Sequence, residues 1–459
     1  MKLLSFKPNQ FVLFSCSLLL SAPVWSQKTV LDEYIQQAWH SNLVVQEKNM
    51  SLEKAKQSLE IARSYFLPEV NFIMGYQTAG GGRNIELPLG TLLNGAYTTL
   101  NQLTGTNFFP QLKDESINFF PKNFHDAKVR TTMAIVNPDR KYNREIAAQQ
   151  IPLSEMELTI YKRDLARDVK QAYFQYLSSL KVISIYEQAL TLAEEAKRVN
   201  QRLLENGKGL PAYVIRSESE IESVKAMLFA AKQQSVNAAY YFNFLLNREA
   251  GTDISGTYQV AASDTSFLNL QEILTGQVNA RDEMKLLNQV RSIQETVLKM
   301  RKSAVSPRLN GFLDLGNQSE KWKINDQSRY YFLGLQLDIP LFTGQRNKTR
   351  VQQAEVDVNI AALQVQRTQQ QLQLASSSAA NNFAASRQTY HASERQLQAA
   401  AAYQRLIERG FREGVNSFIE TIDARNQFTT AQLQQTINLY KMLMAAAELE
   451  RQLAIYPFN

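Results

Sequence analysis

The sequence predicts a mainly α-helical chain that also carries part of a membrane β-barrel. Two patterns support this fold class: short segments of strict apolar–polar alternation, and long segments with apolar residues at heptad spacing. Both patterns occur in residues 330–355, where the alternation that includes Leu335 ends at Pro340 and a helical stripe begins after Gly344. The stripe consists of Val351, Val358, Val365 and Leu372. Because a strand leading directly into a very long helix is unusual in a soluble domain, we expect the apolar strand face to contact lipid.

Residues 1–26 have the features of a secretory signal peptide. Lys2 and Lys7 precede an apolar run over residues 11–20, which is too short to span a bilayer as a helix. Cys16 lies in this run and is a candidate for lipid attachment. We interpret it instead as an ordinary residue of the signal, because the apolar run continues past it. Since Cys16 is the only cysteine, the mature chain would contain no disulfide.

The first half of the mature chain begins with a helix and a strand. Residues 30–64 predict a helix with Asp32 as its N-cap, and Leu67-Pro68 ends it. Alternation over residues 68–77 then predicts a strand of about ten residues, the length that crosses a bilayer when tilted. The connection over residues 78–127 is long, so we expect an irregular loop that is functional or partly disordered. Its many Leu and Phe residues suggest that it packs on itself or over a barrel mouth.

A second strand, predicted over residues 128–138, leads into a long helix over residues 143–205. The helix carries an apolar stripe at alternating spacings of three and four, formed by Val169, Tyr173, Tyr176, Leu180, Ile183 and Leu190. A helix of this length would be on the order of 90 Å long. Gly207 and Gly209 end it, and Pro211 begins a helix that returns to about residue 248.

The same order of elements then recurs, which indicates an internal duplication. We expect the first repeat over residues 27–251, a linker over 252–266 and the second repeat over 267–459. The second repeat contains a helix over 272–303, strands over 307–316 and 330–341, a helix from 345 to the turn at 410–414, and a helix over 415–453. Each repeat therefore has the order helix, strand, strand, helix, turn, helix.

Four membrane strands in one chain cannot close a barrel. Open edges would leave backbone N–H and C=O groups unsatisfied in hydrocarbon, at several kcal/mol each, and the smallest single-chain barrels have eight strands. Several chains would therefore contribute four strands each, with the polar strand faces lining water. The expected lumen residues are Glu69, Asn71, Arg308, Asn310, Gln336 and Asp338. The residues expected in an aromatic girdle are Tyr76, Tyr330, Tyr331 and Phe342. The alternative, a soluble sheet over helices, fits such long helices poorly.

The sequence gives little support to other classes of protein. The net charge is +7, but the charges are interspersed, so we expect no nucleic acid partner. The three histidines, His40, His125 and His391, are isolated and predict no metal site. The glycines at 80–82 lack the Lys-Ser/Thr of a phosphate loop, and no nucleophile–base motif stands out. We therefore expect no enzyme, catalytic residue, cofactor or metal.

Several short motifs occur in a characteristic order along the mature chain. They are Thr29-Val30-Leu31-Asp32-Glu33, Ala62-Arg63 before Leu67-Pro68, the segment 339–344, and the turn at 411–414 followed by Phe418, Ile419, Asp423 and Ala424. In these motifs the mature chain resembles the TolC family of outer-membrane efflux proteins. The resemblance implies a homotrimer in a Gram-negative bacterium, with a twelve-stranded barrel in outer-membrane lipid. An α-helical coiled-coil tunnel would continue this barrel through the periplasm.

The resemblance also implies a function, namely the exit duct of a tripartite efflux or type I secretion system. Such ducts dock on a periplasmic adaptor (membrane fusion) protein and an inner-membrane transporter of the RND or ABC type. Met and His do not cluster, which argues against a dedicated copper or silver system. The alternative is a periplasmic coiled-coil scaffold or an adaptor-like protein without a pore. Such a protein would need no lipid-facing strand face.

The family closes its tunnel at the periplasmic end with acidic residues on the last hairpin. The matching residues are Glu420 and Asp423, which lie on one helix face and would bring six carboxylates together in a trimer. A solvated helix face is the alternative. The family also has an ionic latch, in which an Arg and a Tyr beside the turn bond to an Asp on the other hairpin. The positions that match this latch are Asn416, Phe411 and Tyr213, so we expect a looser or apolar closure.

Four glycines mark the two hairpin tips, at positions Gly207, Gly209, Gly410 and Gly414. By the same resemblance, these tips would contact the adaptor protein. Helix C-capping is the simpler role for such glycines, and it is compatible with adaptor contact.

Overall fold

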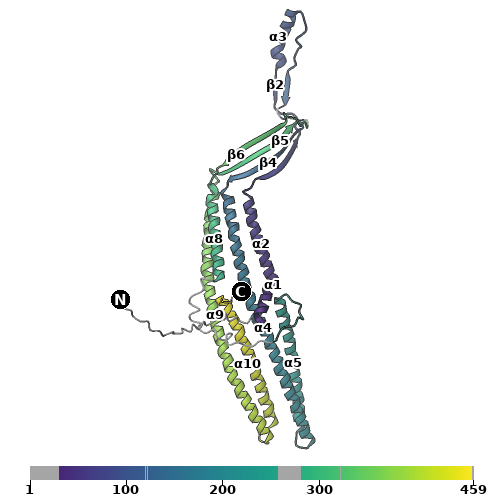
Figure 1. Cartoon of the computed structure of the whole chain (residues 1–459), viewed down its shortest axis with the longest axis vertical. Helices are drawn as coiled ribbons and strands as arrows, with labels where there is room; N and C mark the ends of the chain where they lie inside the picture. Colours follow the sequence, from purple (N-terminus) through teal and green to yellow (C-terminus); the bar gives the residue numbers. More distant parts are fainter. Residues whose placement is uncertain (1–29, 119, 121, 257–280, 321, 457–459) are drawn as a thin grey trace, which may run out of the picture.

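The computed structural model describes residues 30–118, 120, 122–256, 281–320 and 322–456. The expected signal peptide and most of the expected linker lie outside these residues. The molecule is elongated, with a sheet between two long helical hairpins at one end and a narrow arm at the other (Figure 1). Within the described ranges, no helix combines the length and the apolar character needed to cross a membrane.

Residues 30–64 form two helices, where we expected one. These are α1 (Val30–Ser41) and α2 (Leu43–Ser64). The break is at Asn42, whose side-chain oxygen accepts hydrogen bonds from the N–H groups of Val44 and Val45 at 3.0 and 3.3 Å. Asn42 is therefore the N-cap of α2. Asp32 lies in the first turn of α1 and is not its N-cap, so that expectation was also wrong.

Four antiparallel strands form the main sheet in the order β1-β4-β5-β6. They are β1 (Glu69–Gln77), β4 (Phe124–Val136), β5 (Arg308–Ser319) and β6 (Arg329–Asp338). Each overlaps the strand expected at its place, and β4 begins four residues early. The repeats meet where β4 pairs with β5, and the register shifts there between Ala134 and Val136. In the described part of the chain, β1 and β6 each have one edge without a partner strand.

Two helical hairpins extend from the sheet (Figure 1). They consist of α4 (Pro138–Glu205) with α5 (Pro211–Leu245), and α9 (Arg346–Arg412) with α10 (Phe418–Leu453). With 68 and 67 residues, α4 and α9 are each on the order of 100 Å long. Helix α8 (Asp282–Lys302), followed by a 3₁₀ turn at Ser303–Val305, packs on both α4 and α9. Helix α10 also packs on α4, which joins the two repeats.

The main core lies where α1, α4, α10 and the end of α5 meet. Its largest fully buried side chains include Ile35, Tyr173 and Phe242. The Tyr173 hydroxyl donates a hydrogen bond to the carbonyl of Ser255 at 2.8 Å, so its one polar atom is satisfied. Burial raises the pKa of Tyr173 to about 12. This core fixes the first hairpin against the second at the level of α1.

Ion pairs join α4, α8 and α10 near the end of α10. Arg451 contacts Asp164 at 2.5 Å and Glu283 at 2.7 Å. Burial would raise the pKa of Glu283, but the hydrogen bond from Arg281 and the charge of Arg451 outweigh it and lower the pKa to about 2. The carboxylate of Glu283 therefore stays charged at neutral pH and pairs with Arg451, which also contacts Asp164 of α4.

The connection between β1 and β4 forms an arm with its own secondary structure, where we expected an irregular loop. It contains β2 (Asn84–Leu87), α3 (Leu89–Thr104) and β3 (Glu115–Asn118). Strands β2 and β3 pair with each other, so the connection packs on itself, which is one of the two alternatives expected. The arm points away from the helical hairpins (Figure 1).

Candidate functional site

The strand register places all six expected lumen residues on one face of the sheet. Residues directly opposite each other in an antiparallel pair share a face. Arg308 lies opposite Asp338 and Asn310 lies opposite Gln336, which fixes the polar face of β5 and β6. At the other side of the sheet, Glu69 lies opposite Thr132 and Asn71 opposite Arg130. That this face lines a water-filled lumen stays a prediction.

The opposite face of the sheet is apolar and exposed. Leu335 on β6 has 70% of its surface exposed, and Leu333 and Leu337 beside it are similarly open. Strand β1 continues this face with Val70, Phe72 and Met74. Monomeric soluble proteins rarely expose so large a contiguous apolar patch, so the face requires a partner or lipid.

A network of charged side chains on the polar face was missed in the sequence. Arg130 donates two hydrogen bonds to Asp314, at 2.7 and 2.6 Å, across the β4–β5 pair. Asp126 accepts hydrogen bonds from Lys128 at 2.8 Å and from the hydroxyl of Tyr330 at 2.6 Å. The signal was available, because Lys128 and Arg130 alternate with the apolar positions of the same strand.

Tyr330 corrects part of the expected aromatic girdle. Its hydroxyl bonds to Asp126, so it lies on the polar face and not on the apolar one. Tyr76 does lie near the arm end of the sheet, where its ring stacks on Trp322 with centroids 5.9 Å apart. Trp322 also stacks on His125, with centroids 4.5 Å apart. Within the described residues, no group of three or more potential ligands could hold a metal ion.

The expected gate residue Glu420 has a local structural role at the start of α10. Its carboxylate accepts hydrogen bonds from the N–H of Ser417 at 2.7 Å and from the side chain of Asn416 at 3.1 Å. The Ser417 hydroxyl accepts from the N–H of Glu420 at 3.3 Å, which completes a capping box. The N–H of Ser417 and the amide of Asn416 lower the pKa of Glu420. Asp423, one turn further, is exposed and accepts from Gln427 at 2.8 Å.

Two of the three expected latch positions, Tyr213 and Phe411, meet in an aromatic cluster instead of ion pairs. Phe418, the first residue of α10, is only 3% exposed. Its ring lies 5.2 Å from that of Tyr213 on α5 and 6.2 Å from that of Phe411 at the end of α9. Phe418 therefore joins the two hairpin tips of one protomer through apolar contact.

The tip glycines satisfy backbone requirements of the turns. Gly207 and Gly414 have φ of 70° and 78°, the left-handed conformation that commonly ends a helix. A Cβ on Gly410 would lie 1.9 Å from the side-chain oxygen of Asn416, and one on Gly209 would lie 2.7 Å from the backbone of Leu204. The capping role is therefore present, and adaptor contact stays a prediction.

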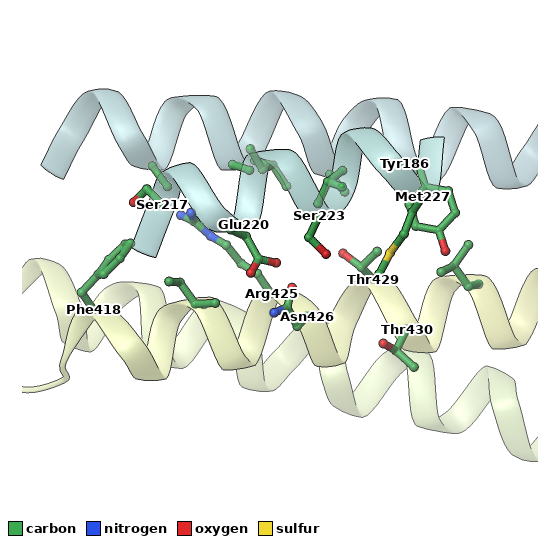
Figure 2. Close-up of a pocket in the computed structure, with 17 residues that line it drawn as sticks. Tyr186, Ser217, Glu220, Ser223, Met227, Phe418, Arg425, Asn426, Thr429 and Thr430 are labelled. Atoms are coloured by element: carbon green, nitrogen blue, oxygen red, sulfur yellow. The ribbon is translucent and has the colours of Figure 1, made fainter. Parts of the chain in front are cut away.

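A cavity of about 360 Å³ lies between the two hairpins, close to their tips (Figure 2). It is lined by α4, α5 and α10, and its side chains include Glu220, Met227 and Arg425 (Figure 2). Arg425 also pairs with Glu408 on α9 at 2.9 Å. Burial would raise the pKa of Glu408, but hydrogen bonds from Gln404 and Arg425 outweigh it and lower the pKa. The sequence alone did not predict this cavity.

Comparison with known proteins shows which proteins this chain resembles. Residues 288–454 match the family model described as outer membrane efflux protein. A search of the curated proteins found no significant match.

Three solved structures are similar to this chain over almost its whole length. A membrane protein from Pseudomonas aeruginosa shares 16% identity and a TM-score of 0.74, with 93% of this chain and 94% of that chain covered. The open-state MtrE outer membrane channel of Neisseria gonorrhoeae shares 16% identity and a TM-score of 0.72, covering 92% and 88%. The Campylobacter jejuni CmeC outer membrane channel shares 13% identity and a TM-score of 0.72, covering 92% and 85%.

These matches confirm the predicted resemblance and the mainly helical fold class with a barrel part. Residues 288–454 thus match the outer membrane efflux protein family model, and the chain as a whole has the fold of these outer-membrane channels.

Proposed function

We propose that three copies of this chain form an exit duct across the outer membrane of a Gram-negative bacterium. The duct conducts substrates from a periplasmic tunnel to the cell exterior, as part of a tripartite efflux or type I secretion system. One observation carries this proposal: the sheet has an exposed apolar face and a polar face, and its strands continue into helices on the order of 100 Å long. Lipid would cover the first face and water the second.

The free edges of β1 and β6 support a closed assembly. Backbone groups at these edges cannot remain unpaired in hydrocarbon, and β6 of one copy can supply the partner for β1 of the next. Three copies give a barrel of twelve strands, which lies within the range that membrane barrels use. A periplasmic scaffold without a pore is the weaker candidate, because it would leave the apolar face around Leu335 in water.

We propose the periplasmic tips as the docking site for an adaptor protein, with an inner-membrane transporter beneath it. The cavity lined by Met227 and Arg425 supports this, since it lies between the two hairpins close to their tips. The second tip also presents exposed apolar residues, Val415 in the turn and Ile419 in the first turn of α10.

The duct is tested by placing one charge on each face of the same strand. Leu335→Asp puts a carboxylate in lipid and should cost about 2 kcal/mol near the midplane, so trimers should be depleted from the outer membrane. Gln336→Asp, one residue along and on the other face, should assemble as the unmodified chain does. Cross-linking in native outer membranes measures both. Detection of only monomers for the unmodified chain, or an equal loss of trimers in both variants, would contradict the duct.

The gate is tested separately. We propose that Glu420 and Asp423 from three copies form an acidic ring at the tunnel's narrow end. Like charges held this close repel one another, and a hydrated divalent cation relieves the repulsion. The purified trimer in a planar bilayer should therefore pass a small current that divalent cations block from the periplasmic side.

The matched variant is Glu420→Gln with Asp423→Asn, because glutamine preserves the capping box with Ser417. This double variant should lose the block and retain the trimer. Glu413→Gln, which neutralises another exposed carboxylate of the same turn, should retain the block. If the double variant keeps the sensitivity of the unmodified chain, the two carboxylates form only a solvated helix face.

A further inference from the structure

Helix α3 in the arm directs its polar side chains toward its own chain. The Asn94 amide donates to the carbonyl of Leu112 and accepts from its N–H, both at 2.8 Å. The Asn101 amide does the same with Phe109, at 2.8 and 3.0 Å. Because Asn94 and Asn101 lie two turns apart, they define one helix face that holds the returning segment. Thr98, between them, accepts from Gln111 at 3.1 Å.

The opposite face of α3 is apolar and open to solvent. It presents residues at spacings of three and four, namely Leu89, Leu92, Ala96, Thr99 and Leu103. Leu92 is 70% exposed and Leu103 is 78% exposed, and Phe108 just beyond the helix is 86% exposed. The Thr99 hydroxyl donates to the carbonyl of Gly95 at 3.0 Å, which satisfies it within the helix. This arrangement reverses that of an ordinary surface helix, whose apolar stripe faces its own core.

The segment of the arm that contains this stripe carries no charged residue. Residues 87–112 contain no Asp, Glu, Lys or Arg. Asp114 lies just before β3, where its carboxylate accepts from the N–H groups of Gly90 and Thr91 at 2.8 and 3.0 Å and so anchors the start of α3. A symmetric contact brings identical groups of several copies together, so a surface without charge avoids the repulsion that charged copies would create.

The place of the arm favours contact between copies. The arm leaves β1, an edge strand that must pair with a neighbouring copy in the proposed duct. It extends beyond the end of the sheet opposite the helices (Figure 1). A closed ring of three copies would therefore carry three arms around its outer mouth. A helix that lies on a membrane surface usually has Lys or Arg on its polar face, and α3 has neither.

We propose that the α3 helices of three copies pack along the stripe formed by Leu89, Leu92, Ala96, Thr99 and Leu103, and together cap the outer mouth of the duct. The partner of each stripe is a second copy of this chain. The proposal rests on the trimeric duct proposed above. Its chemistry is that of a short coiled coil, in which apolar residues at heptad spacing exclude water. The cap is a second barrier, at the opposite end of the molecule from the periplasmic tips.

Disulfide trapping tests the cap in the full-length trimer. The only native cysteine is Cys16, in the expected signal peptide, so single-cysteine variants report one position. In trimers of Leu103→Cys, oxidation should form one disulfide between two of the three chains. A non-reducing gel then shows these two chains as a dimer. Gln102→Cys is the matched control, because it is exposed but lies about 100° around the helix from the stripe. It should give little dimer under the same conditions.

A conductance measurement provides the second readout. Leu92→Asp with Leu103→Asp should separate the helices by charge repulsion and raise the current through single trimers, whereas Gln102→Asp should not. Intact trimers that neither cross-link through Leu103→Cys nor respond to the aspartates would overturn the cap and leave the duct standing. Chains that fail to form trimers at all would count against the duct itself. Protection of a Leu103→Cys thiol by lipid vesicles, without cross-linking, would assign the stripe to a membrane and also overturn the cap.

Discussion

The two hairpin tips have the same kind of turn, yet they begin their second helix in different ways. Both turns end the first helix with a glycine in the left-handed conformation, Gly207 in one and Gly414 in the other. Helix α5 then begins at Pro211 with no side-chain cap, whereas α10 begins with a full capping box. The backbone feature imposed by sterics is thus present at both tips, while the side chains that start the next helix differ.

The second tip also supplies the contact between the two. Phe418 inserts its ring between Tyr213 of the first hairpin and Phe411 of its own. The first tip therefore depends on a residue of the second for its packing. The capping box of the second tip is built only from its own residues Ser417 and Glu420, and Asn416 adds a hydrogen bond to Glu420.

The largest effect is expected at the shared ring. Phe418→Ala removes a side chain that is almost fully buried and should cost about 3 kcal/mol in the local stability of both tips. Hydrogen exchange of the first turns of α5 and α10 measures this. Ile419→Ala, at the next position and 62% exposed, is the control and should change little. Faster exchange in α10 alone would show that the tips are independent.

The glycines should behave alike at the two tips. Gly207→Ala and Gly414→Ala force an alanine into a left-handed conformation and should each cost about 1 to 2 kcal/mol. Their new methyl groups meet no atom within 4 Å, so the backbone alone causes the loss. Gly251→Ala, also in open space but without positive φ, should be neutral or slightly stabilising. Thermal unfolding of the trimer compares the three, and a cost at only one tip would contradict the shared backbone requirement.

The side-chain N-cap of the second helix should matter at the second tip only. Ser417→Ala removes the side chain that accepts from the N–H of Glu420 and should cost about 1 kcal/mol. The corresponding residue before α5, Leu210, makes no capping hydrogen bond, so Leu210→Ala should not loosen α5 by loss of a cap. Exchange rates of the first turn of each helix distinguish the two, and equal loosening would show that the capping box is not what holds α10.

The smallest effect is a pH dependence confined to the second tip. The pKa of Glu420 is lowered below its ordinary value of 4.5. Its contribution to stability is therefore present above about pH 4.5 and is lost as the pH falls through the lower folded value. Exchange in the first turn of α10 should accelerate in that acid range, and that of α5 should not. In Glu420→Gln the acceleration should disappear, and its persistence would assign the acid response to another group.

The sequence predicted the strands well because their signal is local. A strand with one apolar and one polar face must alternate, so β1, β5 and β6 were located within a few residues. The same alternation also marks Arg130 as a polar-face residue, although its pairing with Asp314 needed the register between strands of different repeats. Even the capping box is visible as Ser417 followed three residues later by Glu420, and that signal was overlooked.

Other features depend on contacts that sequence patterns do not carry. The break between α1 and α2 was hidden because Asn42 caps α2 while the apolar periodicity continues across it. Helix α3 was missed because its polar residues hold a returning segment of the same arm, and no spacing rule indicates such pairing. The contact between Phe418 and Tyr213 depends on how two hairpins lie beside each other, which is a tertiary arrangement.

The unpaired edges of β1 and β6 also bear on how the protein reaches its final place. In the proposed duct, a single newly exported chain would have hydrogen-bonding groups along the edges of β1 and β6 that other copies satisfy. Insertion into the bilayer is therefore coupled to oligomerisation, and its rate should rise more steeply than linearly with the concentration of exported chains. At low expression, unassembled chains would remain in the periplasm with an apolar face exposed, where holdase chaperones and proteases compete for them. The biogenesis of the proposed duct would in this sense be a collective event, governed by the meeting of three chains and not by the folding of one.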